Sequence, residues 1–471
     1  MLVFIILQVA TPANITILRK GEIIKTTPPF EIVLIIRDIM KEFNKGQRIK
    51  TASGGELEVI QKLGEGGQGI VYKVKYNGKN LALKWYFGNK LNDADKFYRN
   101  IENNIKQGTP NAAFLWPLEI TEYFEGSFGY LMELRPSEYK DFSLFLLAKE
   151  RFANIHAIIN AALNITSGFR ALHNRGFSYQ DLNDGNFFVN PKSGDVLICD
   201  NDNVAPYGEN LGIAGKCRYM APEVVMGKKR PDTHTDRFSL AVILYLLLFL
   251  NHPLEGKKTM CPCLTEEHER KFYGSEPVFV WDEHDDSNRP VRGVHLNEIR
   301  LWPVYPKFIH DAFLEAFSRD SLIGNDTEHR IQEKKWQEVF TALRDCTIKC
   351  RCGSETFIDI SSSGWKCMEC GKDIPSYPIL KVKKYNVVLA PGQNLYACHV
   401  INDSDDYKEI NGEVITSRND PSLLGLKNNS TNNWTAILPN GASKAYSNGT
   451  VIKLGRGMKI DFGNGNVGEV I

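Results

Sequence analysis

Two periodicities of apolar and polar positions run through the first two thirds of the chain. Strand-like runs rich in β-branched and aromatic residues cover 57–63 and 80–86, and helical patterns follow at 93–107, 144–172 and 236–250. The first kind of run suits a pleated sheet, and the second suits a helix with a buried face. Together they predict an α+β fold for this part of the chain.

A different pattern begins at Lys381, where short apolar runs alternate with Gly, Asn and Asp turns. Runs of this length between turn residues predict short strands. We therefore expect a small β-sandwich at 380–471. The runs that carry this prediction are 386–389, 394–397, 434–438, 451–454 and 459–463.

Length and composition set broad limits on the number of domains and on the kinds of partner. The length of 471 residues suits roughly two to four domains, and an apolar share of 42% is that of a globular protein. A formal charge of +1 gives no reason to expect attraction to nucleic acid or to a membrane surface. The apolar run 240–250 is too short to span a bilayer.

The first residues, 1–14, contain an apolar run with no basic residue before it. A secretory signal needs a positively charged start and a longer apolar core. We interpret the run as a buried strand or as the result of an inaccurately assigned first residue, within an N-terminal extension at 1–50. The cysteines do not suggest a disulfide ladder, and we expect a chain with free thiols to belong in the cytoplasm.

The stretch 179–202 carries the clearest candidate chemistry. Asp181 is followed by Asn186, and Asp200 closes the strand-like run 196–199. A carboxylate can accept the proton of an attacking hydroxyl, and a carboxylate with an amide offers the oxygen ligands that Mg²⁺ prefers. The same letters also suit a polar loop between a helix and a hairpin.

A glycine-rich motif precedes this stretch, with glycines at Gly64, Gly66 and Gly69. A dinucleotide site needs a helix after such glycines. Here β-branched and aromatic residues follow, so we expect a hairpin. Without side chains in the way, its backbone N–H groups can approach phosphate oxygens.

These motifs resemble those of the protein kinase family, and the resemblance covers about residues 56–345. It implies a bilobal kinase domain at 51–345, with lobes at about 51–134 and 137–345. Asp181 would then orient and deprotonate the substrate hydroxyl, and Asn186 and Asp200 would hold Mg²⁺.

Further kinase-like elements imply the nucleotide site. Lys84 would contact the ATP phosphates, paired with Glu102 or, as a second choice, Asp95. Residues 128–136 resemble the strand and hinge behind the adenine. The implied nucleotide-binding residues are Gly64, Gly66, Gly69, Val71, Ala82, Lys84, Met132, Glu133, Asn186 and Asp200.

Residues 221–223, Ala-Pro-Glu, match the close of the family's activation segment, and we pair Glu223 with Arg330. The segment 203–220 contains no Ser or Thr, and only Tyr207 and Tyr219 could accept a phosphate. We therefore expect that activity does not require phosphorylation of this loop.

The chain also departs from the family. Tyr179 and Gln180 replace His-Arg before the catalytic Asp, and Asn183 stands where Ser/Thr kinases usually carry a Lys. Asn201 and Asp202 replace the Phe and Gly after Asp200. We expect Asn201 not to fill the apolar slot of that Phe, and Asp202 to serve structure or face water rather than hold a second metal.

Two cysteine pairs with a following glycine predict a structural zinc ribbon at 346–375. The ligands would be Cys350, Cys352, Cys367 and Cys370. Free thiols or two disulfides are the alternative. Cys261 and Cys263 have no matching second pair.

We expect an ATP-dependent protein kinase acting on Ser or Thr hydroxyls of a protein substrate. The alternatives are a pseudokinase scaffold and a kinase of small molecules. The β domain would be an interaction module for a regulatory protein. Its tail faintly resembles forkhead-associated domains, with Arg418 and Ser422 as remnants of a phosphopeptide site.

Overall fold

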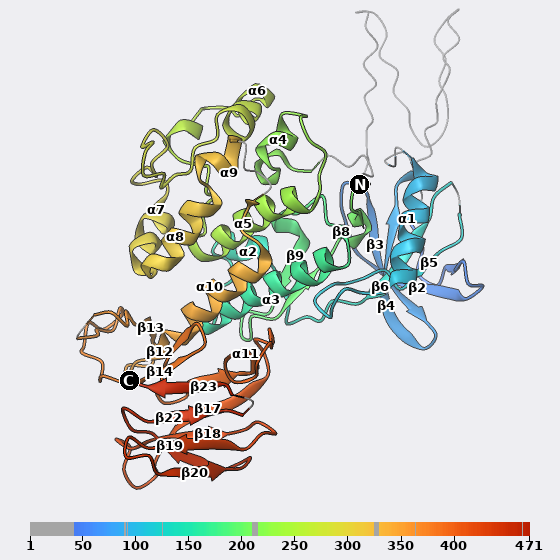
Figure 1. Ribbon diagram of the computed structural model, residues 1–471. Coiled ribbons are helices and arrows are strands. Elements are labelled where there is room, and N and C mark those ends of the chain that lie inside the picture. Colours follow the sequence, from blue (N-terminus) through green and yellow to red (C-terminus); the bar gives the residue numbers. More distant parts are fainter. Residues whose placement is uncertain are drawn as a thin grey trace, which may run out of the picture. The chain divides into compact units, whose positions relative to one another are not determined.

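The computed structural model (Figure 1) describes residues 42–88, 91, 93–124, 126–209, 215–324, 329–362, 364–463 and 465–471. The chain divides after Phe43 into two units, and the description below concerns the second, Asn44–Ile471. The expectation for 1–14 therefore lies outside the described residues. No helix in the described part of the chain is long and apolar enough to cross a membrane.

The first lobe is an antiparallel sheet with one helix. Its order is β1-β2-β3-β4-β6-β5, and it begins at Arg48, slightly before the predicted boundary. The strands are β1 (Arg48–Lys50), β2 (Glu56–Glu65), β3 (Gly69–Tyr76), β4 (Lys79–Tyr86), β5 (Glu119–Ile120) and β6 (Gly129–Glu133).

Helix α1 (Ala94–Gln107) belongs to this lobe, and Asp93 caps its N-terminus by accepting a hydrogen bond from the Lys96 N–H. Its apolar residues Phe97 and Ile101 join one core with Tyr86 of β4. The helix thus lies against the strand that carries Lys84.

The second lobe is mainly helical, and α5 is buried on nearly every side. A helix that is apolar all round belongs in the centre of a core, which confirms the central helix expected at 236–250. The helices are α2 (Phe142–Leu146), α3 (Ile155–Asn174), α4 (Pro222–Val225), α5 (Thr233–Phe249), α6 (Glu266–Arg270), α7 (Leu296–Leu301), α8 (Lys307–Ala316), α9 (Arg319–Ile323) and α10 (Glu333–Asp345).

Short strands in the second lobe hold the candidate catalytic loop. One sheet has the order β10-β9-β7, and another pairs β8 with β11. They are β7 (Lys140–Asp141), β8 (Phe177–Ser178), β9 (Phe187–Val189), β10 (Val196–Ile198) and β11 (Ala205–Pro206). Residues 257–305 contribute Tyr273, Phe279 and Val280 to the core of this lobe.

A cysteine-bearing hairpin and two antiparallel sheets complete the chain. The sheets have the orders β15-β14-β23-β22-β19-β20 and β16-β17-β18-β21, and they share a core around Trp434. The elements are β12 (Thr347–Lys349), β13 (Glu355–Phe357), β14 (Ile379–Val382), β15 (Tyr385–Val388), β16 (Asn394–Tyr396), α11 (Ala397–Val400), β17 (Ile410–Thr416), β18 (Leu424–Asn428), β19 (Trp434–Ile437), β20 (Ser443–Tyr446), β21 (Val451–Lys453), β22 (Lys459–Asp461) and β23 (Val467–Val470).

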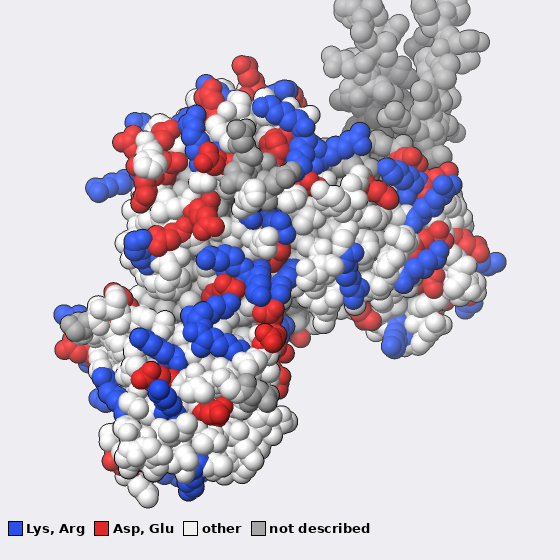
Figure 2. Space-filling view, in the orientation of Figure 1, with Lys and Arg blue, Asp and Glu red and all other residues white. Residues whose placement is uncertain are grey.

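Buried polar contacts join this last region to α10. His399 and Asp345 are both fully buried, with 3.1 Å between Nε2 and the carboxylate. Arg344 donates to the carbonyl of Tyr407 at 2.8 Å. On the face in Figure 2, acidic and basic residues are interspersed rather than gathered by sign.

Candidate active site

The glycine-rich motif forms the predicted hairpin between β2 and β3, with the Gly66 N–H donating to the Gly69 carbonyl at 2.9 Å. A Cβ on Gly69 would lie 2.0 Å from the Trp85 carbonyl oxygen, so packing requires that glycine. A Cβ on Gly64 or Gly66 would meet nothing within 4 Å. Those two glycines leave open space at the hairpin, which suits phosphates held by backbone N–H groups.

Lys84 on β4 is buried against two carboxylates. Its Nζ lies 3.1 Å from Asp200 and 2.8 Å from Asp202, and 3.4 Å from the side-chain oxygen of Gln68 in the hairpin. Burial alone would lower the pKa of Lys84, but Asp200 and Asp202 outweigh it and raise the pKa above its usual value. Lys84 therefore carries its charge beside the hairpin.

The two carboxylates differ sharply in exposure. The side chain of Asp200 is 43% exposed, while that of Asp202 is fully buried. Asp202 also accepts hydrogen bonds from the hydroxyls of Tyr86, at 2.5 Å, and Tyr130, at 3.4 Å. Asp202 therefore serves the structure, one of the two uses expected for it, and does not face water.

Glu102 does not pair with Lys84 in the described structure, which corrects the predicted pairing. The buried face of α1 is formed by Phe97, Asn100, Ile101 and Asn104, and Glu102 lies beside it. Both asparagine amides donate to the Val204 carbonyl, at 2.8 and 2.9 Å. The second choice, Asp95, is exposed and accepts from Tyr123.

Asp181 lies in the loop after β8. Its carboxylate accepts hydrogen bonds from the amides of Asn183 at 3.2 Å and Asn203 at 3.5 Å. Burial raises the pKa of Asp181 to about 6, against the lowering effect of the Asn183 hydrogen bond. A carboxylate with a pKa near neutrality is suited to accept a proton from a hydroxyl.

Asn186 and Asp200 are brought together by the backbone, because the Cys199 N–H donates to the Asn186 carbonyl at 2.9 Å. Asn186 is buried, and its side-chain oxygen accepts from the Asn183 N–H at 2.8 Å. Asp200 adopts a left-handed conformation, with φ at 55°. Carboxylate and amide oxygens are a donor set that fits Mg²⁺.

Two departures from the family pattern have clear structural uses. Tyr179 is fully buried, and its hydroxyl donates to the Cys199 carbonyl, next to Asp200. The side-chain amide of Asn201 donates to the carbonyls of Leu115 and Ile198, both at 2.9 Å. Asn201 is thus fully buried, and hydrogen bonds hold it in place of the apolar packing that a Phe would make.

The predicted back of the adenine pocket forms one cluster. Ala82 and Met132 are cross-strand partners on β4 and β6, and Val71 packs beside them. Glu133 is exposed at the end of β6. The structure therefore gathers the apolar residues of the predicted pocket.

The predicted pair of Glu223 and Arg330 is confirmed. The guanidinium meets the carboxylate through two hydrogen bonds, at 2.8 and 2.9 Å. This two-point geometry is the strong form of such a contact. It anchors the end of the activation segment to Arg330, which lies shortly before α10 in the chain.

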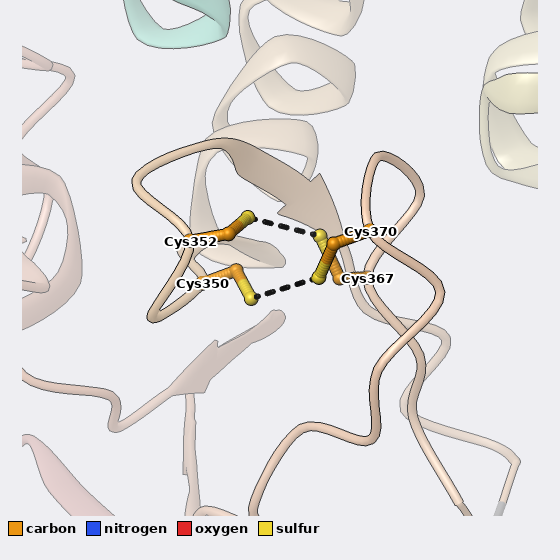
Figure 3. Close-up of side chains that lie close together, drawn as sticks. All are labelled: Cys350, Cys352, Cys367 and Cys370. Carbon is orange, nitrogen blue, oxygen red and sulfur yellow. Dashed lines mark hydrogen bonds between the residues drawn. The ribbon is translucent and has the colours of Figure 1, made fainter.

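Four thiols meet in a second candidate site (Figure 3). Cys350 and Cys370 are 3.9 Å apart at sulfur, Cys352 and Cys367 are 3.7 Å apart, and all four sulfurs lie within 4.8 Å of one another. A disulfide needs about 2.05 Å. Tetrahedral zinc with bonds of about 2.3 Å places sulfurs about 3.8 Å apart, so these thiols could hold a metal ion.

Comparison with known proteins agrees with this geometry. Residues 57–291 match the family model of the protein kinase domain. The chain is similar to a cyclin-dependent serine/threonine-protein kinase of Dictyostelium discoideum, named as probable, at 25% identity over 58% of this chain and 41% of the relative. It is similar to the protein kinase YegI of Escherichia coli at 24% identity, over 63% of this chain and 46% of the relative.

A third relative is serine/threonine-protein kinase 36 of Pongo abelii, 27% identical over 44% of this chain and 17% of the relative. The chain thus spans less than half the length of these curated relatives. The kinase match covers most of the first lobe and the second lobe as far as residue 291, with the hairpin, Lys84, Asp181 and Asp200. Residues 57–291 therefore carry a protein kinase domain, and this domain supports the assignment of the chain as a protein kinase.

Proposed function

We propose that this chain is an ATP-dependent protein kinase that transfers the γ-phosphate to Ser or Thr hydroxyls of a protein substrate. One observation carries the proposal. Charged, buried Lys84 links the open glycine hairpin to the half-exposed carboxylate of Asp200. This contact supports phosphate binding and metal binding at one place.

The chain's own residues have distinct roles in the proposed reaction. Lys84 and backbone N–H groups of the hairpin at 64–69 hold the nucleotide phosphates. Asp181 orients the substrate hydroxyl and takes its proton. Asp200 and Asn186 would hold Mg²⁺, which when bound neutralises charge on the phosphate oxygens.

The test is transfer of radiolabelled phosphate from ATP to a generic protein substrate by the purified chain. We expect transfer by the wild type and a loss of about a hundredfold or more in Asp181→Ala, because the hydroxyl loses its proton acceptor. Equal transfer by both proteins would contradict the assignment. Nucleotide binding without transfer by the wild type would favour the pseudokinase scaffold.

We also propose that the activation segment works without phosphorylation. The side-chain amide of Gln180 donates to the Glu209 carbonyl at 2.6 Å and so binds the segment through its backbone. Tyr219 is buried, while Tyr207 is 60% exposed. A neutral amide has no charge with which to recognise a phosphate.

We therefore expect unchanged initial rates after treatment of the purified enzyme with a broad phosphatase, and in Tyr207→Phe. The measurement is the initial rate, with mass spectrometry of residues 203–220 before and after treatment. A large loss of rate that coincides with loss of phosphate from this segment would show that the switch exists.

For the cysteine cluster we propose one structural zinc ion held by Cys350, Cys352, Cys367 and Cys370. Gly353 and Gly371 follow the two pairs with φ of 96° and 68°, a conformation that favours glycine. These turns direct each pair of thiols toward the other. All four positions are thiolates, which suits a closed structural site rather than a catalytic one.

The β domain at 380–471 would act as an interaction module for a regulatory protein. The Ser422 hydroxyl donates to Asp420 in its own turn, and Arg418 is exposed. The forkhead-associated resemblance therefore gains no support from these contacts, and we do not propose phosphopeptide binding.

A further inference from the structure

Lys216, in the activation segment, reaches the candidate catalytic loop. Its Nζ donates to the side-chain oxygen of Asn183 at 2.8 Å and to the Asp184 carboxylate at 3.3 Å. The side chain is 56% exposed. The ammonium therefore lies at the loop surface with room for a further partner.

Asn183 joins this ammonium to the candidate base. Its amide nitrogen donates to Asp181 at 3.2 Å, while its amide oxygen accepts from Lys216. Lys216 and Asp181 also line one small cavity together with Met220 and Ser239. The positive charge and the proton acceptor thus belong to one connected polar group.

Two glycines leave space for this arrangement. A Cβ on Gly185 would lie 3.1 Å from the Asn183 side-chain oxygen and 3.6 Å from the Lys216 Nζ. A Cβ on Gly215 would lie 3.3 Å from the Asp181 carboxylate. Larger residues at either position would crowd the polar group, so the backbone is shaped around it.

We infer that Lys216 supplies, from the activation segment, the positive charge that the catalytic loop lacks at Asn183. This inference rests on the proposed kinase activity. The substrate oxygen bonds to the γ-phosphorus, the bond from that phosphorus to the ADP oxygen breaks, and the hydroxyl proton passes to Asp181. Negative charge on the transferring phosphoryl oxygens is stabilised by the Lys216 ammonium.

The location of the charge has a consequence for control. Because Lys216 belongs to the activation segment, its ammonium reaches the loop only while the segment packs there. Gln180 holds the same segment through the Glu209 carbonyl. Order in the segment and charge at the reacting phosphate are thereby coupled without a phosphorylated residue.

The test compares Lys216→Met with Lys228→Met, a matched control at an exposed lysine beyond α4. We expect kcat to fall about a hundredfold in Lys216→Met, with little change in the KM for ATP, and no change in the control. The acid limb of the rate profile should also move to higher pH, because Lys216 lowers the pKa of Asp181.

A variant that moves the positive charge to position 183 tests the role of the charge more directly than Lys216→Met alone. Asn183→Lys in the Lys216→Met background should recover at least a tenth of the wild-type kcat, and Lys216→Arg should retain most of it. Thermal melts and binding of a fluorescent ATP analogue verify folding in every variant.

The outcomes separate the two proposals. No transfer by the wild type would refute the kinase activity itself. A wild-type rate in Lys216→Met, with an active wild type, would refute only the role of Lys216. A fall in Lys216→Met with neither recovery by Asn183→Lys nor retention by Lys216→Arg would also refute it, since charge would then not be what matters.

Discussion

Asp200→Ala is expected to abolish phosphate transfer with only a small loss of stability, because Ala fits the left-handed backbone at this position less well than Asp. Asp202→Ala is expected to lower both transfer and stability. The two carboxylates are close in sequence and contact the same Lys84. The half-exposed side chain of Asp200 is available to a metal ion, whereas the fully buried side chain of Asp202 is enclosed by protein.

The physical reason for the second effect is burial. Without Asp202, the buried Lys84 keeps only Asp200, and the hydroxyls of Tyr86 and Tyr130 lose their shared acceptor. Removing one partner of a buried ion pair costs about 3–5 kcal/mol. Without Asp200, the pair of Lys84 and Asp202 stays intact, so the free energy of unfolding should change little.

Denaturant unfolding of the full chain and radiolabelled transfer are measured side by side. Glu102→Ala is the matched control, because Glu102 lies off the buried face of α1 and pairs with no described lysine of the site. We expect wild-type stability and rates within a few fold for this control. Loss of transfer in Glu102→Ala, with a stable Asp202→Ala, would restore Glu102 as the partner of Lys84.

The sequence predicts the order of elements well because each has a local signal. Glycines followed by β-branched residues predict the β2–β3 hairpin, and a long apolar run predicts α5. The pair of Glu223 and Arg330 follows from the kinase resemblance, and the structure confirms it. Short-range patterns and family motifs therefore predict most of the architecture of the two lobes.

The partner of Lys84 was mispredicted although part of the signal is in the sequence. Phe97 and Ile101 define the apolar stripe of α1, and Asn104 falls on that stripe while Glu102 does not. Tyr86 shares the strand face of Lys84, since alternate residues point to the same side. A tyrosine hydroxyl there needs a buried acceptor, which Asp202 provides.

Other contacts could not be read from the sequence. The turn at η3 (Asn201–Asn203) follows the left-handed Asp200 and directs Asp202 inward, and no periodicity reports such a turn. Lys216 meets Asn183 across a long loop, so the contact depends on how the activation segment folds back. A positive charge that approaches position 183 from another part of the chain can therefore be found only from the three-dimensional structure.

Mutation of Cys367 to Ser is expected to unfold the hairpin at 346–375 and leave nucleotide binding by the kinase lobes intact. The segment supplies few core residues of its own: Ile348, Ile358, Trp365 and Ile374 lie around Cys367, and Val388 and Ala390 join them from beyond the segment. So few apolar side chains rarely hold a fold alone, and structural zinc supplies the missing free energy in such units. Loss of one thiolate therefore removes most of what stabilises it.

Elemental analysis of the purified wild type should find about one zinc per chain, and chelation should make 346–375 sensitive to protease. Cys261→Ser is the matched control, since Cys261 lies outside the cluster in the described structure. Binding of a fluorescent ATP analogue reports on the kinase lobes in each variant. A metal-free wild type whose 346–375 segment resists protease would contradict the zinc site. Loss of ATP binding in Cys367→Ser would show that the ribbon also supports the kinase domain, through the strand β12 that directly follows α10.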